Sequence, residues 1–331
     1  MAFNGVGVTT VEYLGDLFLQ HKRPNAFLRL AGGFQGGIKK TMSREFPIGT
    51  FYTLPNPSQP ARLEGGTAPS PNNTSITQTT NVVQIFQEAV STTYLAQSEH
   101  SVSGVVPIPQ GEMNGPVQNP RTQEFQVQRT LEKIAQDSNY SFLNGVYTNP
   151  GDPSSTALGT RGILTSVVSN LQDNSAVGGT ITNVIYRGWV NSVLQSMVAY
   201  NGYEVDDTFV LIAGTTEFAN IANAYASLGT IYLTPEAMQF GVKVRKILTT
   251  FGTLLLVLDP DVPAQYFGIL KMDAVGVVGQ EVPNKGFLFE EPLYKSGSSE
   301  QTQIYGQMGV DHGPEYLHGL VKVPAGVAIN L

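Results

Sequence analysis

Two stretches of the chain place apolar residues at the spacing of a helix that packs on one side. The first predicts a long helix over residues 119–145, with Asn119 as its N-cap, Pro120 in its first turn and Gly145 as its stop. At 1.5 Å per residue such a helix is about 37 Å long. Its expected core-facing residues are Val127, Leu131, Ile134 and Phe142. The second stretch predicts a helix over residues 182–200, and a shorter one is expected over 217–226.

Short apolar runs bounded by turn residues predict strands in the second half of the chain. They cover residues 209–213, 242–249, 253–258, 266–271 and 274–278. Residues 302–310 and 316–323 have the same character, and Asp311–Glu315 between them contains Gly and Pro, which predicts a C-terminal hairpin. Helices interspersed with these strands favour an α+β fold in which a sheet is flanked by helices.

Residues 46–96 have the pattern of a long hairpin excursion. Residues 46–54 are aromatic and β-prone, and residues 75–86 alternate between apolar and polar positions with many threonines. Between them the chain is rich in Pro, Gly, Asn and Ser, which favour turns and loops. A two-stranded ribbon is at best marginally stable in water, and no nearby segment supplies a cover for it.

Residues 1–45 are predicted to form an irregular arm, because Gly32, Gly33, Gly36 and Gly37 interrupt every apolar stretch. The net charge of the chain is −7, yet residues 1–50 carry +3 and the remainder −10. Such an arm either contacts polyanions or is simply solvated. Its candidate charges are Lys22, Arg23, Lys39, Lys40 and Arg44.

The composition narrows the class of protein. Only 14% of the 331 residues are charged, against about 25% in an average soluble domain. Interfaces of permanent assemblies are depleted in charge, so this low charged fraction indicates a chain that buries much of its surface in permanent contacts with other subunits. There is no Cys, which excludes disulfides and thiol chemistry. No apolar run reaches the 18 or so residues that span a bilayer, and the first residues lack the pattern of a signal peptide.

Candidate chemistry is sparse. The Gly-rich segment 32–41 fails as a phosphate-binding loop because Ile38, not Lys, follows Gly37. His312 and His318 lie with acidic neighbours across a Gly-Pro turn, without the spacing of a metal site and without a Gly-x-Ser-x-Gly nucleophile motif. We therefore expect no catalytic residue, no metal and no cofactor, and a hydrolase using His312 or His318 is the enzymatic alternative.

The order of these segments, and four stretches within them, resemble a known family. The stretches are residues 79–86 (TTNVVQIF), the helix from Gln123-Glu-Phe to Phe142-Leu-Asn-Gly145, residues 291–297 (EPLYKSG) and residues 303–306 (QIYG). Together they are similar to the major capsid proteins of tailed bacteriophages, which share the Hong Kong 97 fold. The resemblance covers most of the chain.

The resemblance implies a division of the chain into parts. It implies an N-terminal arm (1–45), an extended loop (46–96), a peripheral domain (97–179) with a spine helix (119–145), an axial domain (180–280), and a return to the peripheral domain (281–331) with the C-terminal hairpin. The loop would lie over a neighbouring subunit, which would supply the cover that the two-stranded ribbon lacks within its own chain. The loop residues expected to touch the neighbour are Phe51, Arg62, Glu64, Val83 and Ile85.

The function implied is that of a head shell protein, which self-assembles into hexamers and pentamers around double-stranded DNA. Its partners would be its own copies, a portal, a decoration protein and, since residues 1–45 show no helical scaffolding pattern, a separate scaffolding protein. Because residues 46–96 contain no Lys, the lysine–asparagine bond that joins some relatives is not expected. The expected location is the virion, assembled in the bacterial cytoplasm, with no membrane contact.

Two other structural functions stay open at this point. A host-encoded, encapsulin-like nanocompartment would share the fold but enclose an enzyme, and the neighbouring genes would separate it from a phage shell. A phage tail or fibre component is the other alternative, which the shape of particles in the electron microscope would distinguish from a shell.

Overall fold

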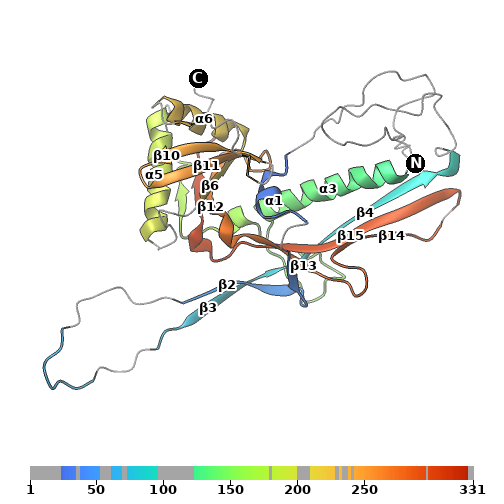
Figure 1. Ribbon diagram of the computed structural model, residues 1–331, viewed down its shortest axis with the longest axis horizontal. Coiled ribbons are helices and arrows are strands. Elements are labelled where there is room, and N and C mark those ends of the chain that lie inside the picture. Colours follow the sequence, from blue (N-terminus) through green and yellow to red (C-terminus); the bar gives the residue numbers. More distant parts are fainter. Residues whose placement is uncertain are drawn as a thin grey trace.

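The computed structural model describes most of the chain as two β-sheets with flanking helices and a projecting ribbon (Figure 1). The described residues are 24–34, 38–52, 61–68, 73–95, 123–178, 181–199, 209–227, 231–232, 238–239, 242–295 and 297–326. Helices and sheets are both present, as the α+β prediction requires.

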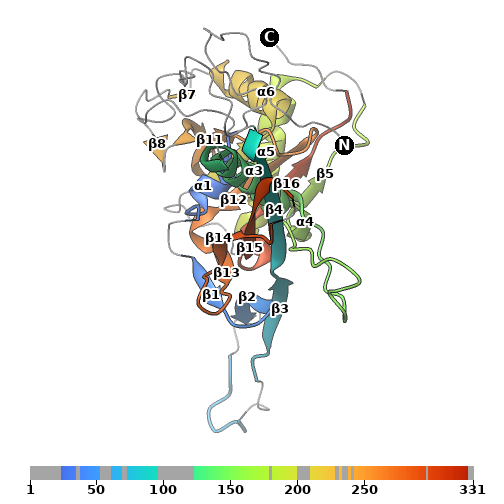
Figure 2. The ribbon, with the colours of Figure 1, turned by 90° about the vertical axis from the view of Figure 1, so that its right-hand side faces the viewer.

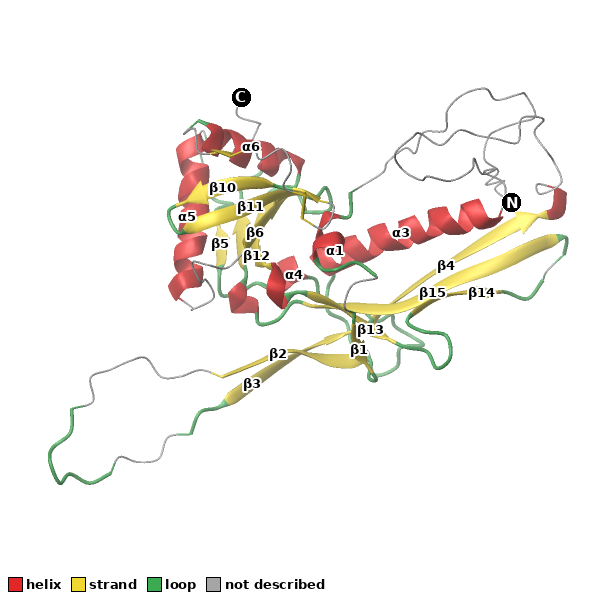
Figure 3. Cartoon of the chain, in the orientation of Figure 1, coloured by secondary structure: helices red, strands yellow, loops and turns green. Residues whose placement is uncertain are grey.

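The first sheet has seven strands in the order β5-β16-β12-β6-β11-β10-β7. These are β5 (Leu171–Asp173), β16 (Gly319–Lys322), β12 (Tyr266–Lys271), β6 (Phe209–Ala213), β11 (Gly252–Leu258), β10 (Arg245–Thr249) and β7 (Ile231–Tyr232). Helices α5 (Asn183–Ala199) and α6 (Thr215–Ala226) cover one face (Figure 3). Alternate residues of β6 pack against these helices or against the opposite face, so the whole strand is buried.

The second sheet has five strands built around the long strand β15 (Ser299–Asp311). Strand β4 (Gln84–Thr93) pairs along residues 299–308, and β14 (Leu288–Pro292) and β13 (Gly276–Gln280) pair with successive parts of β15. Strand β1 (Lys39–Thr41) adds to β13 in parallel. Two of the outer strands, β1 and β4, therefore come from the first third of the chain, whereas the central strand comes from its end.

The long helix α3 (Gln123–Asn144) lies along this second sheet (Figure 1). Its Phe142 ring meets the Phe86 ring of β4 edge to face, with centroids 6.2 Å apart. The predicted cap at Asn119 and Pro120 falls outside the described residues. Gly145 does end the helix, although for a different reason than predicted: a Cβ there would lie 2.3 Å from the Thr160 carbonyl oxygen.

The ribbon consists of β2 (Glu45–Tyr52) and β3 (Ile76–Val82), which pair antiparallel. It leaves the second sheet at its base and projects away from both sheets (Figures 1 and 2). Val83 separates β3 from β4, so the strand predicted over residues 75–86 continues into the sheet. The smaller elements are α1 (Ala26–Leu30), α4 (Ile163–Ser166), β8 (Met238–Gln239), β9 (Val242–Lys243) and two single-turn 3₁₀ helices, η1 (Met272–Ala274) and η2 (Glu315–Leu317).

The predicted C-terminal hairpin is wrong. Strand β15 belongs to the five-stranded sheet, whereas β16 lies between β5 and β12 of the seven-stranded sheet. The physical reason is burial: β16 is apolar and packs under α5, where it gains cover that a surface hairpin would lack. The segment 312–318 is thus a connection between two sheets.

The irregular arm predicted over residues 1–45 is also wrong in part. Helix α1 places Phe27 and Leu28 in the hydrophobic core between α3 and the seven-stranded sheet. A five-residue helix has no stability of its own, so its apolar side chains hold it in place. Of the described helices, none is long and apolar enough to cross a membrane.

Candidate assembly surfaces

The base of the ribbon is anchored in the protein core. Phe46, Ile48 and Val82 are buried, and Phe46 packs with Val278 of β13. The buried Asn81 amide donates to the carbonyl oxygens of Val310 (2.9 Å) and Arg161 (3.1 Å), and its oxygen accepts from the Arg161 backbone N–H at 2.7 Å. A buried amide satisfied in this way fixes the direction in which the ribbon leaves the sheet.

The outer half of the ribbon has no cover from its own chain. Residues 61–68 and 73–79 are all exposed. Apolar side chains lie in the open there, with Tyr52 65% exposed and Leu63 87% exposed. Residues 46–82 carry only two charges, Arg62 and Glu64. A projecting, nearly uncharged ribbon with exposed apolar residues has the character of an interface core.

The five residues predicted as loop contacts have different surroundings. Arg62 and Glu64 are fully on the surface, and Ile85 on β4 is 45% exposed. Phe51 packs edge to face on Tyr316 of the same chain, with ring centroids 5.4 Å apart. Val83 is only 1% exposed and lies in the core with Phe46, so its side chain is covered by its own chain. The alternating pattern around it does not reveal that Val82 and Val83 are both buried.

Two of the charges predicted for the arm form ion pairs within the chain. Lys39 pairs with Asp311 and Lys40 with Glu281, each at 2.6 Å. Both lysines lie on the surface strand β1, and Arg44 is half-buried at the base of the ribbon. Lys22 and Arg23 lie outside the described residues. Two of the five candidates therefore compensate acids of their own subunit.

Three of the four residues predicted as the core of α3 are buried. Val127, Ile134 and Phe142 belong to the cluster shared with β4 and β15. Leu131 is the exception, because it is 39% exposed and belongs to none of the hydrophobic clusters among the described residues. The helical spacing identifies its face, but the described sheet does not cover that turn of the helix.

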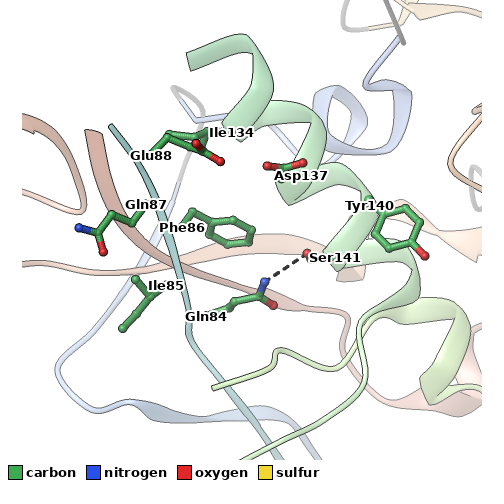
Figure 4. A pocket seen from close by; sticks show the side chains of 9 residues that line it. All are labelled: Gln84, Ile85, Phe86, Gln87, Glu88, Ile134, Asp137, Tyr140 and Ser141. Carbon is green, nitrogen blue, oxygen red and sulfur yellow. Dashed lines mark hydrogen bonds between the residues drawn. The ribbon is translucent and has the colours of Figure 1, made fainter. Parts of the chain in front are cut away.

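A groove of about 330 Å³ runs between β4 and α3 (Figure 4). Phe86 and Ile134 are the buried apolar residues among those lining it. At one end Gln84 donates to the Ser141 hydroxyl at 3.3 Å, and near the other Glu88 pairs with Lys133 of α3. The remaining residues that line it are Ile85, Gln87, Asp137 and Tyr140. Sequence reasoning missed this groove because its two walls lie some 50 residues apart in the chain.

A buried polar junction ties helix α1 to α3 and to the end of β11. Asp259 accepts the Phe27 N–H at 2.9 Å, and Asn139 accepts the Leu28 N–H at 2.9 Å. The Asn139 amide also donates to the carboxylates of Asp259 (3.1 Å) and Asp261 (2.8 Å). Burial raises the pKa of Asp259 to about 6. Asp259 and Asp261, which follow strand β11, therefore have a structural role.

The two histidines of the enzymatic alternative are buried in the connection between the sheets. His318 accepts from the Lys271 N–H at 3.3 Å through Nδ1 and donates to the His312 carbonyl oxygen at 2.6 Å through Nε2. His312 donates through Nδ1 to the Gly313 carbonyl oxygen at 2.9 Å. Burial lowers the pKa of each to about 4. These ring contacts are with the backbone rather than with a nucleophile, and within the described residues no cluster of three metal-binding side chains occurs.

A sequence profile of one family covers nearly the whole chain. The profile of the SU10 major capsid protein matches residues 2–325. The chain belongs to the SU10 major capsid protein family. This capsid protein is therefore a structural component of the virion that assembles with its own copies into a phage head shell, and neither an enzyme nor a tail or fibre component.

Solved structures show the same fold over the same length. The capsid of cyanophage A-1(L) aligns with a TM-score of 0.62 and 11% identity, covering 97% of this capsid protein and 99% of that chain. The capsid of Myoviridae phage XM1 aligns with a TM-score of 0.57 and 11% identity over 94% and 96% of the two chains. The predicted Hong Kong 97 fold is confirmed.

The fold also occurs in a nanocompartment. The holo-SrpI encapsulin complex from Synechococcus elongatus PCC 7942 aligns with a TM-score of 0.58 and 11% identity, covering 96% of this capsid protein and 94% of that chain. At this identity the likeness concerns the fold alone. Among curated proteins, no sequence matches this capsid protein.

Proposed function

We propose that this capsid protein builds an icosahedral head of hexamers and pentamers in which the ribbon of each copy lies over a neighbouring copy. The observation that carries this proposal is the exposure of the ribbon beyond its anchored base. Its exposed apolar residues and its backbone edges gain cover only from another molecule. The many repeated contacts of a closed shell make a modest contact per copy sufficient.

The two sheets supply the domains of this proposal. The seven-stranded sheet with α5 and α6 is the axial domain, which meets its copies around the five-fold and six-fold centres. The five-stranded sheet with α3 is the peripheral domain. The proposed axial domain therefore differs from residues 180–280, because β5 and β16 pair within the first sheet and β13 pairs within the second.

The proposal includes the partners of the head. Double-stranded DNA fills the shell and is contacted without sequence specificity, and Lys22, Arg23 and Arg44 are the arm charges proposed for this contact. A portal, a separate scaffolding protein and a decoration protein complete the head, which assembles in the bacterial cytoplasm. The subunits associate without covalent bonds, because residues 46–96 offer no lysine.

Shortening the ribbon tests the proposal. We replace residues 53–75 by an Asn-Gly turn, which keeps the anchored strands β2 and β3 and suits a two-residue hairpin. Co-expression with the scaffolding protein is expected to yield folded subunits but no closed shells by electron microscopy.

A matched control shortens the exposed loop at residues 151–156, which the Thr148–Gly159 bridge closes, and this variant should still assemble. Normal shells from the ribbon variant would contradict the proposal.

A further inference from the structure

Arg62 is the cation of the projecting ribbon. Residues 46–82 contain no other Lys or Arg, and the side chain is exposed on a segment, residues 61–68, whose residues are all exposed. In the described part of the chain, Arg62 makes no ion pair or hydrogen bond, unlike Lys39 and Lys40 at the base. The ribbon thus presents a single guanidinium, with Glu64 as its only other charge, and a guanidinium is suited to a carboxylate on another surface.

The groove between β4 and α3 offers such a carboxylate. Asp137 lies on α3 within the groove, beside the apolar floor formed by Phe86 and Ile134 (Figure 4). The Glu88 carboxylate of the opposite wall is already paired with Lys133, whereas Asp137 accepts no hydrogen bond from the described residues. With Lys133 neutralising one acid, the groove keeps one excess negative charge.

The groove also desolvates this carboxylate. Burial is the largest cause that raises the pKa of Asp137 above its ordinary value, and the nearby Glu88 and Asp261 add to it, while Lys133 opposes it. Other exposed acids without recorded partners, such as Glu124 and Glu290, do not line this groove. Asp137 therefore gains more from an incoming cation than these acids do, because a partly desolvated charge is less screened by water.

The shape of the groove suits the rest of an arginine. The three methylenes of an arginine side chain are apolar and pack well along surfaces such as Phe86 and Ile134, while the guanidinium reaches the charged rim. The Tyr140 ring also lines the groove and is half exposed, so it offers a stacking face for a guanidinium.

Arg62 and Asp137 of one chain do not meet. The ribbon projects from the base of the five-stranded sheet and carries residues 61–68 away from α3, which two perpendicular views agree on (Figures 1 and 2). A contact between these two surfaces is therefore made between copies. Because each copy carries both surfaces, the same contact repeats from copy to copy, and in a head-to-tail arrangement it closes a ring when the rotation between copies allows closure.

We propose that the groove between β4 and α3 of one copy receives Arg62 from the ribbon of a second copy, with Asp137 as its ionic partner. This inference rests on the proposed function, since it names the surface that the ribbon covers. It also assigns a use to the groove.

A charge-exchange experiment on the full-length protein tests the pairing. Arg62→Glu and Asp137→Arg each set like charges against each other, and each is expected to raise the subunit concentration needed for shell assembly roughly tenfold or more. The double variant R62E/D137R restores the opposite pair and is expected to assemble within about twofold of the parent protein. Sedimentation and electron microscopy measure the fraction in shells.

Two comparisons make the result specific. Glu124→Arg reverses another exposed acid of α3 outside the groove, and R62E/E124R is expected to assemble as poorly as R62E alone. Because residues 62, 124 and 137 are exposed, thermal melting of the dissociated variants should match the parent.

The inference is overturned if R62E/D137R assembles no better than the worse single variant, or if neither single variant impairs assembly. If the variant with the shortened ribbon does not assemble, while the charge-exchange variants show no coupling between residues 62 and 137, the proposed function is supported and this pairing is contradicted. If the shortened ribbon assembles normally, both fall.

Discussion

At the scale of single residues, buried polar side chains fix how the parts of the chain join. Asn139 and Asp259 bind the backbone of helix α1, and His312 and His318 bind the connection between the two sheets. The sequence shows these residues but gives no sign of their burial, because their partners lie more than 40 positions away or on the backbone. The acidic residues beside His312 and His318 in the sequence made them the candidates of the enzymatic alternative.

The buried histidines predict how stability depends on pH. In the unfolded chain a histidine has a pKa near 6.5, whereas burial holds the pKa of His318 at about 4 in the folded protein. As the pH falls from about 6.5 to 4, the unfolded state binds protons that the folded state does not bind, so the free energy of unfolding falls. Asp259, whose folded pKa is about 6, acts in the opposite direction between pH 6 and 3.8.

His318→Gln isolates the contribution of this histidine. The amide of glutamine supplies the acceptor and the donor that His318 uses, but it does not titrate. The unfolding free energy of the dissociated variant should fall less steeply between pH 6.5 and 4, by at most about 1.4 kcal/mol per pH unit. Denaturant titrations at several pH values measure this slope. A slope equal to that of the parent would contradict the buried, neutral state of His318.

At the scale of elements, the hydrophobic periodicity predicts which helices and strands form, but it does not predict which strands pair with each other. The strands expected over residues 209–213 and 266–271 appear with those bounds, because continuous apolar runs flanked by turns have few alternatives. The predicted hairpin pairing of β16 with β15 was wrong, because the pairing of a strand depends on which apolar surface covers that strand. Helix α5 covers β16. Helix α1 was missed because five residues are too few to show a helical period.

The packing of α5 on β16 gives a test at this scale. A Cβ at Gly319 would lie 2.2 Å from Cγ1 of the buried Val193 and 2.9 Å from Sδ of Met197. Gly319→Ala is therefore expected to destabilise the dissociated protein by about 1–3 kcal/mol, because β-branched Val193 has little freedom to move. Chemical denaturation of the variant measures the change.

Gly188→Ala on the same helix is the matched control. A Cβ at Gly188 meets no atom within 4 Å, so alanine should stabilise α5 by about 0.5–1 kcal/mol through its higher helix propensity. If Gly319→Ala proved as stable as the parent, the close seating of α5 on β16 would be incorrect.

At the scale of the whole molecule, the order of segments and the low charge predict a chain that is completed by its copies. The ribbon was recognisable from the sequence because Pro, Gly and Asn separate two Thr-rich stretches with no local cover. The groove between β4 and α3 was not, because it exists only when segments 84–88 and 134–141 are brought together. The groove proposed to receive the ribbon is thus harder to predict from the sequence than the ribbon itself.

Hydrogen exchange of the ribbon amides tests the central claim most directly. In dissociated, dilute protein, the backbone N–H groups of the exposed residues 76–79, which pair with strand β2 alone among the described strands, should exchange much faster than those of the buried residues 81–83. In assembled shells the amides of residues 76–79 should become protected by at least about tenfold, because a neighbour covers them. Protection of residues 76–79 already present in the dissociated chain, or equal exchange in both states, would contradict the claim that identical copies complete this fold.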